Sequence, residues 1–245
     1  SINADSWQAH CQQFCKTLSV PLLTREVQVD APGNIEEGAR IARYQVFSSL
    51  LAKHDCLLLG HHIDDQAETL LLHLFRGAGV DGMAAMAPMS KLAKGVLVRP
   101  LLQHSRDRLE AYAHQHQITW IEDESNQNSA FSRNYLRHQI MPLLREKWPN
   151  VVGNLARSAA HCQQAKLNLE ALAEIDCIEL GRQVDRLSLP PLRSLNQARL
   201  VNVLRVWLKR NQVRYPSAAV LKRVIDEVIF AKGDATPYIE WDSIA

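Results

Sequence analysis

Polar residues able to do chemistry are concentrated in residues 60–69, whose sequence is GHHIDDQAET. The apolar run Cys56–Gly60 precedes them and a helical pattern follows, so they lie at the carboxyl end of a predicted parallel strand, where open α/β sheets bind ligands. Asp65 and Glu68 are three positions apart on one helix face, where like charges cost about 0.2–0.5 kcal/mol unless a cation lies between them. We therefore expect a cation here, whether a metal ion, a basic side chain or a substrate ammonium.

Two other interpretations of this segment stay open. Asp65 as the helix N-cap with Glu68 three residues later is close to a capping box, in which both carboxylates serve the local backbone. A metal site would use His61, His62, Asp64 and Asp65. Consecutive strand residues point to opposite faces, so the two histidines are poorly placed to share an ion, and we expect no protein-held metal.

The elements that must position these residues alternate along the first part of the chain. Strands are predicted at Val20–Val29, Cys56–Gly60, Val96–Leu101 and Ile118–Ile121, and helices at Trp7–Leu18, Asn34–Lys53, Asp64–Phe75 and Ser105–His116. In the second helix the apolar spacing predicts one buried stripe, made of Ile35, Ala39, Ala42, Val46 and Leu50. Strands and helices that alternate at these lengths predict an α/β fold, a parallel sheet with helices on both faces.

Helical patterns dominate after Arg133. They cover Arg133–Trp148, Val151–Ile178, Asn196–Arg210 and Ser217–Ala231, with one strand predicted at Val184–Leu189. We therefore expect a second, smaller and mainly helical domain, with residues 1–149 forming the first domain and residues 150–245 the second.

Composition limits the class of protein. The 245 residues are 47% hydrophobic and 22% charged, which is typical of a globular protein and excludes disorder and coiled coil. No apolar run approaches the roughly 18 residues that span a bilayer, so we expect a cytoplasmic protein without a membrane partner. Five scattered cysteines argue against a disulfide framework. Residues 1–132 carry a net charge of −4 and residues 133–245 of +6, a weak indication that the second half faces a polyanion.

Six further blocks accompany the segment at residues 60–69 in a fixed order. They are E-x-x-A-R-x-x-R-Y at 36–44, R-G-x-G at 76–79, G-M-x-x-M at 82–86, R-P-L-L at 99–102, E-D-x-S-N at 122–126 and R-N-x-x-R-x-x-x-x-P at 133–142. Together the blocks resemble the tRNA(Ile)-lysidine synthetase family of PP-loop ATPases, over essentially the whole chain. The resemblance implies the fold of the adenine nucleotide alpha hydrolase-like proteins.

The resemblance also implies a reaction. Family members are ATP-dependent carbon–nitrogen ligases that attach L-lysine to carbon 2 of the wobble cytidine in the CAU-anticodon isoleucine tRNA. ATP and Mg²⁺ are the implied cofactors, and a homodimer is one alternative for the assembly. Asp65 and Glu68 are implied to recognise lysine and, with Arg76, to form the catalytic set.

Other residues are implied to bind ATP or tRNA: His61, Arg76, Ser125, Asn126, Arg133, Asn134 and Arg137. Arg133 and Arg137 lie at the predicted start of a helix, where the helix dipole disfavours cations, so a neighbouring anion is expected. That anion is a tRNA or ATP phosphate, or else a carboxylate among residues 122–124. Arg76 has an alternative role in compensating the carboxyl end of its own helix.

One departure from the family pattern is large. The family binds ATP phosphates with a Ser-Gly-Gly-x-Asp-Ser loop, and the sequence contains no such motif. We therefore expect these 245 residues to be an incomplete piece, lacking this loop and the C-terminal end, that is inactive alone. Two other functions stay open: a PP-loop enzyme that thiolates cytidine, and a non-catalytic RNA-binding fragment.

Overall fold

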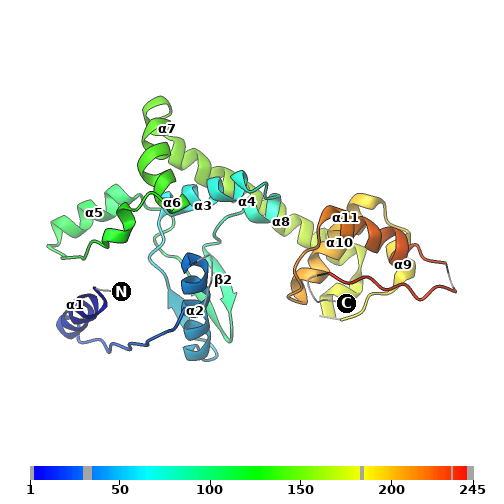
Figure 1. Cartoon of the computed structure of the whole chain (residues 1–245), viewed down its shortest axis with the longest axis horizontal. Helices are drawn as coiled ribbons and strands as arrows, with labels where there is room; N and C mark the ends of the chain where they lie inside the picture. Colours follow the sequence, from blue (N-terminus) through cyan, green and yellow to red (C-terminus); the bar gives the residue numbers. More distant parts are fainter. Residues whose placement is uncertain (1–2, 30–34, 183–184, 233, 242–245) are drawn as a thin grey trace. The chain divides into compact units, whose positions relative to one another are not determined.

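The computed structural model describes residues 3–29, 35–182, 185–232 and 234–241 (Figure 1). The chain divides into two compact units, residues 1–161 and 162–245. The division therefore falls inside helix α8, Val151–Asp176, and not at the predicted boundary between residues 149 and 150. The residues of α8 therefore begin in the first unit and end in the second.

Three short strands form the sheet of the first unit. They are β1 (Cys56–Leu58), β2 (Met89–Leu92) and β3 (Gly95–Val98), in the order β1-β3-β2. β1 and β3 are parallel, with Leu58 opposite Val98, so two of the predicted strands form and pair as parallel neighbours. β2 pairs antiparallel to β3 and was not predicted, because Ser90 and Lys91 interrupt its apolar pattern.

The large parallel sheet is not confirmed. The segments Val20–Val29 and 118–121 form no strand among the described residues, and Val27 and Trp120 are each 46% exposed. Branched and aromatic residues favour strands only where a neighbouring strand offers hydrogen-bond partners, and none of the described strands does so here. What the structure shows is an α/β unit with a small mixed sheet.

The strand predicted at Val184–Leu189 is also wrong for residues 185–189, which the structure describes. Val184 lies outside the described residues, and residues 185–188 form no strand. Leu189 begins helix α9, Leu189–Arg193, because Pro190 and Pro191 hold the backbone in a geometry suited to the first helical turn.

The predicted helices of the first unit form with small shifts at their ends. The structure has α1 (Ala4–Thr17), α2 (Ile35–Leu50), α3 (Ile63–Phe75), α4 (Val80–Met83), α5 (Arg106–Gln115), α6 (Ser132–Tyr135) and α7 (Met141–Lys147). A wider π-helical turn, η2 (Leu136–Ile140), joins α6 to α7. Pro142 has no N–H to donate to the preceding turn, which favours this wider turn just before it.

The buried stripe predicted on α2 is wrong. Ala39 is exposed, Leu50 is 45% exposed, and Ala42 and Val46 are only half-buried. The side chain of Ile35 lies outside the described residues. A sheet of three short strands offers too narrow a face to cover a stripe of this length.

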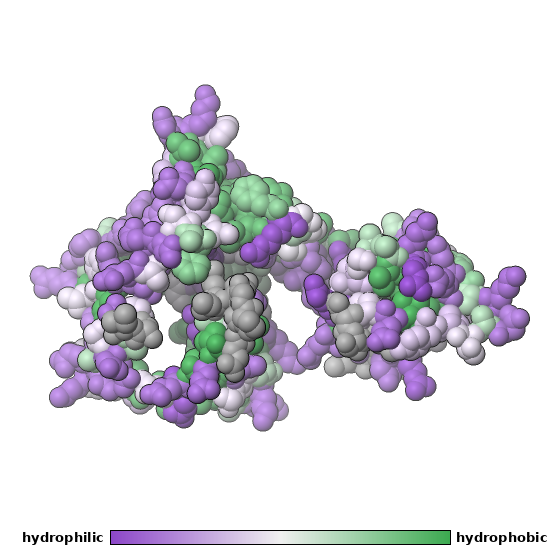
Figure 2. Space-filling model, in the orientation of Figure 1, coloured by the Kyte–Doolittle hydropathy of each residue, from purple (hydrophilic) through white to green (hydrophobic). Residues whose placement is uncertain are grey.

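A small apolar core fixes the helix that carries the candidate site. Ala67 and Leu71 of α3 pack with Leu136 and Met141 from the segment that joins α6 and α7. Val151, Val152 and Leu155 at the start of α8 cover this cluster. Figure 2 shows apolar surface over α7, where Leu143 is 64% exposed.

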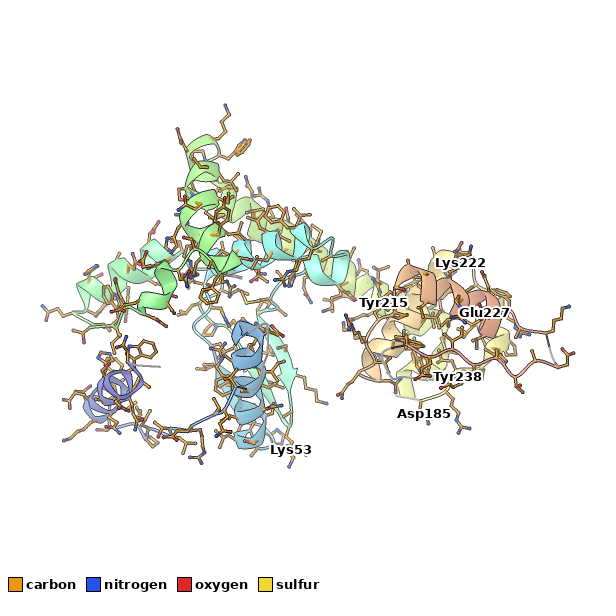
Figure 3. The ribbon with its side chains drawn as sticks, in the orientation of Figure 1. Lys53, Asp185, Tyr215, Lys222, Glu227 and Tyr238 are labelled. Atoms are coloured by element: carbon orange, nitrogen blue, oxygen red, sulfur yellow. The ribbon has the colours of Figure 1, made fainter. Side chains whose placement is uncertain are left out.

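The second unit is a helical bundle. α8 is followed by the irregular helical turn η3 (Ile178–Arg182), then by α9, α10 (Gln197–Arg210), α11 (Ala218–Arg223) and a second irregular turn, η4 (Val224–Ile229). Its core is centred on Leu200 and Val203, which are 1% and 0% exposed. Lys222 and Glu227 lie on the exposed side of α11 and η4 (Figure 3). None of the described helices is both long enough and apolar enough to cross a membrane.

Candidate functional site

The candidate site lies at the carboxyl ends of the two parallel strands. The chain leaves β1 at Leu58 and passes through Gly60, His61 and His62 before α3 begins at Ile63. The N–H of Leu59 donates to the carbonyl oxygen of Val98 at 3.0 Å, so both strands end at one edge. This is the edge at which open α/β sheets bind ligands.

A capping box fixes the start of α3 at Ile63, one residue before the predicted start at Asp64. His62 is the N-cap, and its N–H donates to Oδ2 of Asp65 at 3.0 Å. The predicted box with Asp65 as the N-cap is therefore wrong, because the helix already begins at Ile63. One oxygen of Asp65 serves the local backbone and the other, Oδ1, is left for a second partner.

Arg137 is the cation that the spacing of Asp65 and Glu68 implied. Its Nε donates to Oε1 of Glu68 at 2.7 Å, and its Nη2 donates to Oε2 at 2.9 Å. The same Nη2 lies 3.3 Å from Oδ1 of Asp65, so one guanidinium bridges both acids. Glu68 is only 2% exposed. Burial disfavours the charged guanidinium, but the hydrogen bond and charge of Glu68 outweigh it and raise the pKa of Arg137.

Arg133 completes the pairing of Glu68. Its Nε donates to Oε2 of Glu68 at 3.0 Å, and its Nη2 donates to the hydroxyl of Thr69 at 2.8 Å. The anion expected beside Arg133 and Arg137 is thus a carboxylate in this structure. It comes from α3, however, and not from residues 122–124.

Asp64 links three helices, although the sequence pointed to it only as a ligand of the alternative metal site and not as a lysine-, ATP- or tRNA-binding residue. Its Oδ2 accepts the N–H of Arg106 at the start of α5 at 2.9 Å, and its Oδ1 pairs with Arg145 of α7. Burial opposes ionisation of Asp64, but a hydrogen bond from His62, the N–H of Arg106 and the charge of Arg145 outweigh it and lower its pKa to about 2. Its position next to Asp65, in the first turn of a helix, is a signal in the sequence that points to it.

Asn134 holds a neighbouring loop against α6. Its Nδ2 donates to the carbonyl oxygens of Ser125 and Asn128 at 2.9 and 3.0 Å, and it is 8% exposed. His138 contacts the carbonyl oxygen of Asn126 at 2.9 Å. The structure therefore brings Ser125 and Asn126 beside the helical segment that carries Arg133 and Arg137.

Arg76 lies at the opposite end of α3 from Asp65 and Glu68. It is the exposed C-cap of α3, eleven residues beyond Asp65, or about 16 Å along the helix axis. The structure does not bring it next to the acid pair. Its position agrees with the alternative role at the carboxyl end of its own helix.

A pocket of about 310 Å³ adjoins the acid pair. Its charged lining includes Asp64 and Glu68 on one hand and Arg106, Arg137 and Arg145 on the other. A pocket with both signs of charge suits a ligand that is itself a zwitterion, such as a free amino acid. Within the described ranges, no three His, Cys, Asp or Glu side chains gather as metal ligands.

Comparisons with known proteins find two family models along the chain, one in its first part and one in its last. Residues 1–144 match the family model of the PP-loop domain, and residues 187–245 match that of the TilS substrate binding domain. A tRNA(Ile)-lysidine synthase from Legionella pneumophila (strain Lens) is 54% identical over 99% of this chain and 56% of its own length. Proteins of the same name from Coxiella burnetii (strain RSA 493 / Nine Mile phase I) and Serratia proteamaculans (strain 568) are 42% and 43% identical, over 98% and 97% of this chain and 54% and 55% of theirs. The chain thus spans about half the length of the curated relatives it matches.

Proposed function

Because the chain belongs to the PP-loop family, we propose that the protein acts as a tRNA(Ile)-lysidine synthetase. The observation that carries this proposal is the occurrence of the PP-loop and TilS substrate binding domains in one chain, in the arrangement of relatives named tRNA(Ile)-lysidine synthase. In the proposed reaction, the carbonyl oxygen on carbon 2 of the wobble cytosine attacks the α-phosphorus of ATP and releases pyrophosphate. The ε-amine of lysine then attacks carbon 2 and releases AMP.

Asp65 and Glu68 are proposed to bind the lysine substrate. The pair already binds a guanidinium, which supports its capacity for an organic cation. A lysine ammonium would take the place of Arg137 between the two acids, and the adjoining pocket has room for the rest of the amino acid. Exchange of one cation for another avoids leaving the buried Glu68 with Arg133 as its only cation, which would be costly.

The same exchange would give Arg137 a second role. A guanidinium released from Glu68 becomes available to a phosphate of ATP or tRNA, which it can bind in bidentate form. Arg133, Asn134, Ser125 and Asn126 lie around the same segment and are proposed to share in ATP or tRNA binding, as are His61 and Arg76. Positioning and charge stabilisation would carry the reaction, since neither step needs a covalent enzyme intermediate.

ATP and Mg²⁺ are the proposed cofactors. Mg²⁺ is commonly held by one or two carboxylates together with substrate phosphates, so the absence of a three-residue cluster among the described side chains is compatible with it.

The sequence has no Ser-Gly-Gly-x-Asp-Ser motif, and we propose that these 245 residues alone neither release AMP nor modify tRNA. We propose a cytoplasmic location, where tRNA and lysine are available. Light scattering would decide between a monomer and a homodimer.

The second unit is proposed to bind tRNA. Two of its basic side chains form ion pairs within the unit: Arg199 pairs with Asp176, and Lys209 pairs with Glu170 at 2.6 Å. These ties join α8 to α10, so they fix the bundle that would present the tRNA surface. The match of residues 187–245 to a substrate binding domain supports the assignment.

A labelled-substrate assay on the protein expressed from its whole gene tests the proposal. Incorporation of radiolabelled lysine into the CAU-anticodon isoleucine tRNA, and into no other tRNA, is the expected result. Sulfur transfer to cytidine would instead support a thiolation enzyme. Salt-sensitive tRNA binding without any turnover would indicate a non-catalytic RNA-binding protein.

A further inference from the structure

Arg99 is a buried cation for which the described part of the chain shows no ion pair. It directly follows β3 and is 9% exposed. Its N–H donates to the carbonyl oxygen of Pro88 at 2.8 Å, and its Nη1 donates to that of Ala87 at 2.7 Å. Its buried Nε has no hydrogen-bond partner, and among the described residues no carboxylate forms an ion pair with it. Buried charges are normally paired, so this arrangement indicates a ligand.

The surroundings of Arg99 favour an anion. His61 follows the neighbouring parallel strand, and its Nδ1 is also buried without a partner. Burial lowers the pKa of His61; Asp65 opposes this shift, and the charges of Arg99, Arg133 and Arg43 lower the pKa further. Three cations therefore act on one neutral imidazole. Arg133 is balanced by Glu68, whereas Arg99 has no counter-ion among the residues that the structure describes.

We propose that Arg99 binds a phosphate group of ATP, with His61 as its neighbour, at the edge where β1 and β3 end. This inference rests on the proposed function, because it assumes that the nucleotide occupies this edge. The bond from Nη1 to Ala87 fixes one end of the planar guanidinium and leaves its Nε without a partner. Because Arg99 is only 9% exposed, a phosphate group of a small nucleotide suits it better than the bulky backbone of an RNA.

Equilibrium binding tests the proposal with three variants of the protein expressed from its whole gene. Arg99→Met removes the charge, Arg99→Lys keeps it without the Nε donor, and Arg108→Met is the control at an exposed arginine. The probes are α,β-methylene-ATP and adenosine, measured by isothermal titration calorimetry. We expect Arg99→Met to weaken α,β-methylene-ATP about tenfold, with adenosine unchanged, Arg99→Lys intermediate and Arg108→Met unaffected.

Several outcomes would overturn the assignment of Arg99. Equal losses for both probes would mean that Arg99 only supports the fold through Ala87 and Pro88. No loss for α,β-methylene-ATP, or a loss confined to tRNA affinity, would also contradict it. Failure of the wild-type protein to ligate lysine would refute the proposed function separately, because the calorimetry does not depend on turnover.

A measurement on the unsubstituted protein covers the case in which Arg99→Met fails to fold. The His61 ring is followed by NMR as pH is varied, with and without inorganic pyrophosphate. An anion beside Arg99 would offset the cations that act on His61, so its pKa should rise when pyrophosphate binds. An unchanged titration of His61 at saturating pyrophosphate would contradict the proposal.

Discussion

Arg137 and Glu68 form a bidentate ion pair between two segments that are 69 positions apart in the chain. The pair joins the helical segment after α6 to the first turns of α3, and it reaches Asp65 as well. It satisfies a carboxylate that is 2% exposed, at the edge of the sheet where the candidate site lies. The stability of the site and its proposed exchange of cations both depend on this pair.

Replacement of Arg137 by methionine should destabilise the first unit. Glu68 would keep only Arg133, and removing one partner from a buried ion pair typically costs about 3 kcal/mol. The free energy of unfolding in urea measures the change. Arg108→Met, at an exposed arginine of α5, is the matched control, and a loss for Arg137→Met no larger than that of the control would contradict the role given to the pair.

Asp64 should make stability fall in acid. Its pKa is about 2 in the folded chain against 3.8 for an ordinary aspartate, so the unfolded chain binds the proton first as pH falls. The contribution, about 2 kcal/mol, is fully present above about pH 4 and is lost as pH falls toward 2. Unfolding in urea at about pH 5 and about pH 2 should show a smaller acid loss for Asp64→Asn than for the wild type.

Asp107→Asn provides the comparison for this acid effect, because Asp107 is exposed on α5. Its acid loss should match that of the wild type. An Asp64→Asn protein with the same pH dependence as the wild type would show that the ties to Arg106 and Arg145 do not stabilise the ionised carboxylate.

The proximity of Asp65 and Glu68 was predictable because the two residues are close together in the chain. Asp65 and Glu68 share a helix face by spacing alone, and their need for a cation follows from charge. The spacing did not predict that this cation is Arg137. Arg133 and Arg137 were seen to need an anion, but nothing in the sequence specifies that this anion is Glu68, more than 60 positions away.

The fold was predictable where local pattern decides the structure. Helices α3 and α5 formed within two residues of their predicted ends, because spacing and capping residues such as Ser105 are local signals. The segments at Val20–Val29 and 118–121 have strand composition but form no strand, since pairing depends on partners elsewhere in the chain. The local sequence pattern therefore does not predict which distant strands pair, nor the hairpin that β2 forms with β3.

The core of the second unit offers a prediction that is independent of the site. Leu200 is 1% exposed within the cluster formed by α8, α10, α11 and η4, so Leu200→Ala should cost about 2–5 kcal/mol. Thermal unfolding measures the loss. Leu167→Ala, at a leucine of α8 that is 49% exposed, should cost less than about 0.5 kcal/mol, and similar losses in both variants would argue against this packing.

Steady-state kinetics of Glu68→Gln in the whole protein test the central claim most directly. The substitution keeps the shape of the side chain and removes the charge that is proposed to bind the lysine ammonium. We predict that the KM for lysine rises about tenfold or more while the KM for ATP changes little, and that Glu146→Gln, at an exposed glutamate of α7, changes neither. Equal increases in the KM for lysine and for ATP would contradict the assignment of Asp65 and Glu68 as the lysine site.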